Sequence, residues 1–263
     1  MSGRSGTDPG SAATRAAGKR CPYRAEGRGI LGPNGQSGGD ANIPGPAPHR
    51  DGRGNGPDEY TRPQRGRGAR RRTGEAIMRE FILFSRKGWT TGDFPSLREA
   101  GRLDTVYQCI LTALFLSHRI RRHVRFHAVL NGPPEPPVHL TVDGGALHDV
   151  RVDPDTWGEI LRRVLSGGQH PGVTADRNPF QAVVRDLAGA GARLFVLEER
   201  GRPLEVVELT DHNVFVVGDH VGLPRGEERF VLRFGEKVSI GRTRYLSASV
   251  IDIINHHLDQ RGL

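Results

Sequence analysis

The chain has 263 residues, a formal net charge of +8 at pH 7, 36 glycines and only two cysteines, Cys21 and Cys109. Two cysteines exclude a disulfide framework and a thiolate zinc site, and such sparse use of cysteine is typical of a reducing compartment. No apolar run approaches the roughly 20 residues that span a membrane, and no secretory signal is apparent. The sequence therefore predicts a cytoplasmic protein that does not enter a membrane.

The first 77 residues differ in composition from the rest of the chain. They carry 14 of the 38 Lys and Arg residues and 7 of the 30 Asp and Glu residues, so residues 78–263 are nearly neutral. A segment rich in glycine, proline and arginine cannot bury enough apolar surface to offset its ordering entropy. We therefore predict a disordered basic extension over residues 1–77. Its arginine-rich stretch 65–72 is either an RNA-binding arm or part of a mis-assigned start, because Met78 leads directly into a strand.

Residues 78–263 alternate between strand and helix patterns. A strand is predicted over 79–84, and apolar residues at helical spacing then predict an amphipathic helix over 102–118. Strands are predicted over 124–130 and 138–142, separated by an Asn-Gly-Pro-Pro turn. This arrangement predicts a hairpin-like insertion.

The second half of this region continues the alternation. Asp153 and Pro154 favour a helix start, and that helix is expected to reach Leu165. The remaining expected elements are a helix over 180–187, strands over 193–197, 214–217 and 237–240, and a helix over 246–258. The alternation predicts an α/β fold with a largely parallel sheet covered by helices. No GxGxxG, GKS or GKT motif is present, which removes the commonest dehydrogenase and ATPase sites.

Three stretches resemble the TrmY family of the SPOUT superfamily of RNA methyltransferases. They are residues 101–104 with 115–138, residues 170–173, and residues 216–222 with 238–241 and the C-terminal helix. Because they occur in order and span nearly all of residues 78–263, this region is identified as a SPOUT methyltransferase domain. The resemblance implies a C-terminal trefoil knot that binds S-adenosylmethionine, in a homodimer. Knots are rare, and the residue pattern alone does not predict one.

The same resemblance implies an activity. It is the S-adenosylmethionine-dependent methylation of N1 of pseudouridine in RNA, at position 54 in the T-loop of tRNA. A different tRNA or rRNA base is an alternative within the same fold. A non-catalytic RNA-binding or ribosome-assembly protein is an alternative from another class.

Family position also assigns the cofactor contacts. In this sequence they fall on Leu197, Gly218, Ile240, Gly241, Arg242, Thr243, Arg244, Tyr245 and Val250. Glycine allows the backbone to approach a ligand closely, so amides and carbonyls at Gly218 and Gly222 can bind adenine and ribose without side chains. Related sequences often hold a cysteine at position 250 and a different loop at 241–244, so backbone contacts are the ones expected to persist. His220 either orients the cofactor or base or serves only its own loop.

Asp104 is the candidate for orienting or deprotonating N1 of pseudouridine, and Arg102, Arg121 and Arg122 are candidates for holding RNA phosphates. Each assignment has a structural alternative. An aspartate near a helix start stabilises the helix terminus, and the arginines form a solvated face.

No metal is expected. His118, His123 and His127 lack the partners of a usual metal site, as do His256 and His257. Transfer from a sulfonium requires alignment of donor and acceptor and no metal.

Overall fold

The computed structural model describes residues 77–263. The extension predicted over 1–77 lies outside the described residues except for its last position. Within the described part, no helix is long and apolar enough to cross a membrane. The elements are, in chain order, β1 (Met78–Ser85), α1 (Leu103–Leu114), β2 (Phe115–Leu116), β3 (Arg119–Ile120), β4 (Val124–Leu130), β5 (Val138–Asp143), α2 (Pro154–Leu165), β6 (Val173–Asp176), α3 (Phe180–Gly189), β7 (Arg193–Pro203), η2 (Leu204–Val206), β8 (His212–Gly218), α4 (Arg225–Val231), β9 (Gly235–Ser239) and α5 (Ser247–Gln260).

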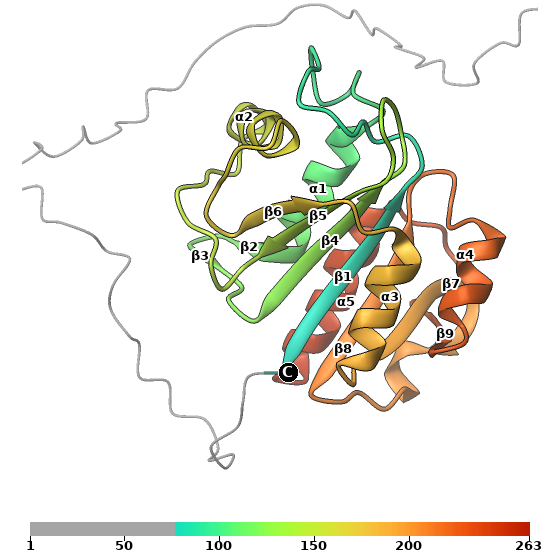
Figure 1. Ribbon diagram of the computed structural model, residues 1–263. Coiled ribbons are helices and arrows are strands. Elements are labelled where there is room, and N and C mark those ends of the chain that lie inside the picture. Colours follow the sequence, from blue (N-terminus) through green and yellow to red (C-terminus); the bar gives the residue numbers. More distant parts are fainter. Residues whose placement is uncertain (1–76) are drawn as a thin grey trace, which may run out of the picture. The chain divides into compact units, whose positions relative to one another are not determined.

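A seven-stranded sheet with the order β6-β5-β4-β1-β8-β7-β9 forms the centre of this part (Figure 1). β1 is parallel to β4 and β8, and β7 is parallel to β8 and β9. Only the pairs β4–β5 and β5–β6 are antiparallel. The predicted α/β fold with a largely parallel sheet is therefore confirmed. The predicted hairpin-like insertion is wrong in one respect, because β4 and β5 pair along their length within the main sheet.

Helices cover both faces of the sheet because successive residues of β1 are apolar on opposite sides. Phe81 and Leu83 belong to the core that α1, α2 and α5 complete. Ile82 and Phe84 belong to a second core that α3 and α4 complete, where Phe84 meets Phe180 edge-on with ring centroids 5.2 Å apart. Figure 1 shows α3 and α4 in front of the sheet and α1 and α5 behind it.

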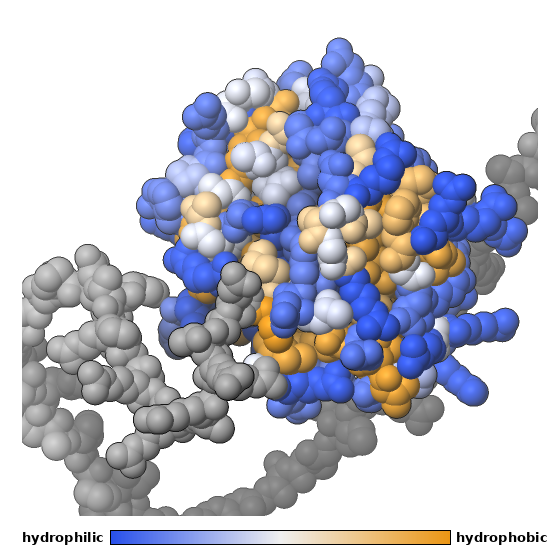
Figure 2. Space-filling view, turned by 60° about the horizontal axis from the view of Figure 1, so that its bottom comes forward, coloured by the Kyte–Doolittle hydropathy of each residue, from blue (hydrophilic) through white to orange (hydrophobic). Residues whose placement is uncertain are grey.

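On the face seen in Figure 2, hydrophobic residues form patches between wider hydrophilic areas. The large apolar residues that remain exposed are Val152, Val206, Val221, Phe234, Tyr245 and Leu246. Tyr245 and Leu246 are consecutive in the sequence and line the cavity described below.

The predicted helix over 102–118 is shorter in the structure. It ends at Leu114 because Phe115 takes an extended backbone, with φ −94° and ψ 140°, and residues 115–120 form the small β2–β3 hairpin. Phe115 packs edge-on against Trp157, with ring centroids 6.2 Å apart. An apolar residue at position 115 fits both the apolar face of a helix and a buried position in a hairpin. The spacing of apolar residues therefore could not tell these two structures apart.

The sequence also missed β6, η2 and α4, which bury very little. β6 and α4 each bury one residue, Val173 and Val231 respectively. Periodicity detects elements through their apolar stripe, and a single buried residue makes no stripe. By contrast, the predicted helix start at Asp153 is confirmed, because its carboxylate accepts the backbone N–H of Thr156 at 2.8 Å.

Buried charge attaches the C-terminal helix to the sheet. Asp259 of α5 accepts two hydrogen bonds from Arg121, at 2.7 and 2.6 Å, and one from Arg79 of β1 at 2.9 Å. Arg79 is 1% exposed and also donates to Asn255 at 3.0 Å. Burial acts to raise the pKa of Asp259, but the hydrogen bonds from Arg121 and Arg79 outweigh it and lower that pKa. A lowered carboxyl pKa stabilises the fold above the ordinary value and loses that effect as pH falls.

We therefore expect Asp259→Asn to lower the free energy of unfolding at pH 7 by about 1–3 kcal/mol, because it leaves buried guanidinium groups without their charged partner. The difference from wild type should begin to shrink below about pH 4, where the carboxyl group of the unfolded chain becomes protonated. It should vanish once the pH has fallen through the lowered pKa of the folded-state carboxylate. Urea denaturation followed by circular dichroism measures both quantities. Asp252→Asn, at an exposed position of the same helix, is the control, and equal effects of the two substitutions would contradict this role.

Candidate functional site

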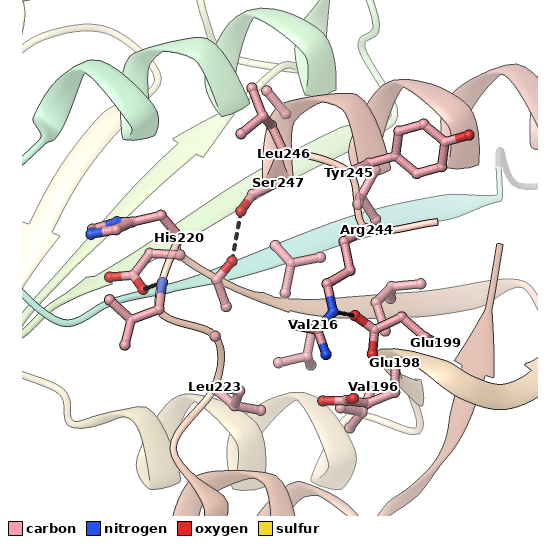
Figure 3. Close-up of a pocket in the computed structure, with 18 of the residues that line it drawn as sticks. Val196, Glu198, Glu199, Val216, His220, Leu223, Arg244, Tyr245, Leu246 and Ser247 are labelled. Carbon is pink, nitrogen blue, oxygen red and sulfur yellow. Dashed lines mark hydrogen bonds and ion pairs between the residues drawn. The ribbon is translucent and has the colours of Figure 1, made fainter. Parts of the chain in front are cut away.

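A cavity of about 660 Å³ lies at the carboxyl-terminal ends of β7, β8 and β9 (Figure 3). These strands are parallel, so the loops that follow them meet at one edge of the sheet, where ligands bind in open α/β folds. The volume lies within the roughly 300–1,000 Å³ of small-molecule sites. The lining also includes Arg102, which precedes α1, Thr105 and Gln108 from α1, and Arg225 and Glu228 from α4.

The loop after β8 is held tightly by its own backbone. A Cβ at Gly218 would lie 2.2 Å from the backbone nitrogen of Leu223, so only glycine fits there. The buried carboxylate of Asp219 accepts backbone N–H groups of Arg86 and Val221, at 2.8 and 2.9 Å. The Ser247 hydroxyl donates to the Gly218 carbonyl at 2.6 Å, which joins the start of α5 to this loop (Figure 3).

The loop after β9 is more open. Gly241 has φ 129°, a conformation that favours glycine, and no atom lies within 4 Å of where its Cβ would be. Residues 241–246 are all exposed. Arg244 donates to Glu199 at 2.7 Å, so the loop reaches back to the end of β7 across the cavity (Figure 3). This loop therefore forms one wall of the cavity while leaving its backbone accessible.

The structure brings together most of the residues predicted to contact a cofactor. The ones that line the cavity are Leu197, Gly218, Ile240, Gly241, Thr243, Arg244, Tyr245 and Val250. Arg242 belongs to the same exposed loop but is not among the lining residues. Contact of these residues with a ligand stays a prediction.

Acidic and basic side chains both line the cavity, which the sequence did not indicate. The acidic ones are Glu198, Glu199, Asp219 and Glu228, and the arginines are Arg102, Arg225 and Arg244. Glu228 is paired with Lys237 and Glu199 with Arg244. Burial and the neighbouring charge of Glu228 raise the pKa of Glu198. Within residues 77–263 Glu198 forms no ion pair, so its carboxylate is the one left to attract a cationic ligand. Glu198 directly follows Leu197, a predicted cofactor contact, so the sequence could have placed Glu198 at the site. Glu228 could not be placed in this way, because it lies on α4, which was not predicted.

Arg102 and Asp104 meet beside the cavity at the start of α1. Arg102 has a left-handed backbone, with φ 72° and ψ 40°, which is unfavourable for a residue other than glycine. Its Nε donates to Asp104 Oδ1 at 2.9 Å. Arg102 lines the cavity, and Asp104 lies next to it without being a lining residue. Because strained backbone gathers at functional sites, the conformation of Arg102 is consistent with a role there.

The other two predicted RNA-binding arginines lie elsewhere and have partners within the protein. Arg121 is 9% exposed and makes its two hydrogen bonds to Asp259. Arg122 donates to the carbonyl oxygens of Gly144 and Leu147, at 3.1 and 2.8 Å. Neither residue lines the cavity, and their contact with RNA remains untested.

The histidines that were considered as metal ligands have other surroundings. His127 is buried and hydrogen-bonded to Glu80 at 2.5 Å and to His139 at 2.9 Å. Burial acts to raise the pKa of Glu80, but His127, Arg125 and His212 together lower it. Within residues 77–263, no group of three or more His, Cys, Asp or Glu side chains is arranged to hold a metal ion.

The close approach at Gly218 gives a direct test of the site's construction. Gly218→Ala should displace residues 218–223 and lower the free energy of unfolding by about 1–3 kcal/mol, because the new Cβ meets backbone atoms. The control is Gly226→Ala on α4, where a Cβ would meet nothing within 4 Å and alanine favours the helix. Chemical denaturation compares the two variants, and a neutral Gly218→Ala would show that this loop is not held as described.

Comparison with known proteins places the chain in a family. Residues 78–263 match the family described as "Putative SAM-dependent RNA methyltransferase". Two relatives are each named tRNA (pseudouridine(54)-N(1))-methyltransferase. The one from Thermococcus onnurineus is 33% identical over 199 residues, covering 69% of this chain and 97% of the relative. The one from Pyrococcus abyssi is 34% identical over 205 residues, covering 71% of this chain and all of the relative.

The fold has a counterpart among solved structures. The crystal structure of Archaeoglobus fulgidus Nep1 bound to S-adenosylhomocysteine matches with a TM-score of 0.52 at 13% identity. The match covers 71% of this chain and 98% of that one, and at this identity it concerns the fold alone. It is the match over residues 78–263 that identifies the chain as a member of the family of SAM-dependent RNA methyltransferases.

Proposed function

We propose that this protein transfers the methyl group of S-adenosylmethionine to N1 of pseudouridine 54 in tRNA. The observation that carries the proposal is the cavity after β7, β8 and β9, which gathers the residues that family position assigns to the cofactor. The names of the relatives from Thermococcus onnurineus and Pyrococcus abyssi supply the substrate. Such a substrate also puts the reaction in the cytoplasm.

The cavity fits a cationic nucleoside. Residues 218–223, Gly241 and residues 243–246 line the cavity, so their main chain borders the space proposed for adenine and ribose. The carboxylate of Glu198 suits the positive charge of the sulfonium or amino group. When bound, S-adenosylmethionine supplies a methyl group that is already activated.

The protein's own contribution to the reaction is alignment and removal of a proton. Asp104 lies beside the cavity, held by Arg102, and accepts the N1 proton of the base or orients that N–H toward it. Arg102 positions Asp104 and faces the cavity at the place where a base presented by RNA enters. For Arg121 and Arg122 we propose a supporting role, because their guanidinium groups are occupied by Asp259 and by backbone carbonyls.

We also propose the trefoil knot and the homodimer that the family implies. The order β8-β7-β9 and the return of α5 to the Gly218 loop support the knot. Exposed Val221, Tyr245 and Leu246 beside the cavity support a contact between two copies. Light scattering of the purified chain should give the mass of two chains, and a monomer at micromolar concentration would reject the homodimer.

Methyl transfer can be tested with two tRNA transcripts that differ only at position 54, one with pseudouridine and one with uridine. With labelled S-adenosylmethionine, we expect label only in the pseudouridine transcript, and nucleoside analysis should recover it as 1-methylpseudouridine. Label at another base would favour the alternative of a different target. No label in either transcript, despite binding of S-adenosylhomocysteine, would favour a non-catalytic RNA-binding protein.

Asp104→Asn should lower kcat by about 10²-fold or more, because an amide cannot accept the N1 proton. Affinity for S-adenosylhomocysteine should stay within about twofold of wild type, since Asp104 does not line the cavity. Asp155→Asn, also in the first turn of a helix, controls for loss of a helix-terminal charge. If both variants lose stability equally and keep their activity, Asp104 has only the structural role.

A further inference from the structure

Four exposed arginines lie on α3 and α4, beginning at the cavity. Arg225, Arg229 and Arg233 are spaced four residues apart along α4 and the turn that follows it, so they lie along one side of the helix. The turn at Arg233 stays helical, because its N–H donates to the Phe230 carbonyl at 3.2 Å. Arg185 of α3 lies across from them, over the ring of Phe230. We name Arg185, Arg225, Arg229 and Arg233 the arginine ridge.

The ridge keeps its positive charge. Within residues 77–263, none of its four arginines forms an ion pair, whereas Arg79, Arg121 and other arginines are paired with carboxylates. Two glutamates share α4 with the ridge, but both are held elsewhere. Gln181 donates to Glu227 at 2.8 and 2.7 Å, and Lys237 pairs with Glu228.

Aromatic rings order part of the ridge without neutralising it. The guanidinium groups of Arg185 and Arg233 each lie 5.7 Å from the centre of the Phe230 ring. Phe234, which is 41% exposed, lies beside that ring with centroids 5.6 Å apart. Cation–π contact holds an arginine in place while leaving its N–H groups free to bind an anion. Arginines combined with exposed aromatic rings form surfaces that hold phosphates and stack bases.

We infer that the arginine ridge binds the RNA backbone next to the nucleotide whose base enters the cavity. This inference rests on the proposed function for its ligand. Arg225 lines the cavity at the start of α4, and Arg102 lines it just before α1, so two separate elements each bring a cation to the cavity. From Arg225 to Arg233 the ridge extends about 12 Å along the helix, which matches a few nucleotides of backbone. Phosphate contacts of this kind set the register of an RNA without reading its sequence.

The test uses the full chain with Arg229→Gln and Arg233→Gln combined, which leaves the cavity lining unchanged. The control combines Arg151→Gln and Arg163→Gln, two exposed arginines near or on α2 that likewise form no ion pair within the described part. Fluorescence anisotropy gives the Kd for tRNA that carries pseudouridine 54, at several salt concentrations. Calorimetry gives the affinity for S-adenosylhomocysteine.

For the ridge variant we expect tRNA binding to weaken about tenfold and the slope of log K against log salt to fall by about 1 to 2. KM for tRNA should rise with kcat and S-adenosylhomocysteine affinity unchanged, and the control should match wild type. A ridge variant that binds tRNA like the control overturns the inference and leaves the proposed function standing, provided the wild type methylates tRNA. If the ridge variant loses tRNA affinity but the wild type methylates no pseudouridine, the proposed function is wrong, and RNA binding by the arginine ridge still holds. Co-sedimentation with anionic phospholipid vesicles checks a second possible ligand of the ridge. If the ridge variant loses binding to the vesicles while its Kd for tRNA is unchanged, the inference is also overturned.

Discussion

The parallel pairing of β1, β8, β7 and β9 is the constraint on which the site depends. Because these strands run in the same direction, the loops that follow β7, β8 and β9 all emerge at one edge of the sheet. Residues of β7 and of the loops after β8 and β9 line the cavity at this edge. The close approach at Gly218 and the bond from Ser247 hold this arrangement. A cofactor site made in this way depends on glycine and loop geometry more than on particular side chains.

Charge serves two separate purposes in this domain. Arg79 and Arg121 are buried against Asp259 and attach α5 to the sheet, so their charges stabilise the fold. Arg102 and Arg225 line the cavity, and the rest of the arginine ridge lies beyond it at the surface, where we propose that its positive charge attracts RNA phosphates. The nearly neutral net charge of residues 78–263 does not reveal these two groups of arginines, because paired and unpaired arginines count equally in a composition.

Sequence patterns predicted the strands and helices that bury apolar stripes, including β1, β4, α2 and α5. They failed at Phe115, where a helical spacing continued into a hairpin, and at α4, which buries only Val231. Resemblance to a family predicted the cavity-lining loops, because the stretches that carry the resemblance include Gly218 and Gly241. It did not predict the charged lining or the partners of Arg121, since both arise from residues distant in sequence that folding brings together.

We propose that the backbone after β8 and β9 binds a sulfonium nucleoside. A crystal structure of the full chain with S-adenosylhomocysteine would decide this. We expect adenine and ribose in the cavity, hydrogen-bonded to main-chain atoms of residues 218–223 and 240–246, with the sulfur facing Arg102 and Asp104. A ligand bound elsewhere, or a cavity filled by Tyr245 and Leu246 with no ligand, would contradict it.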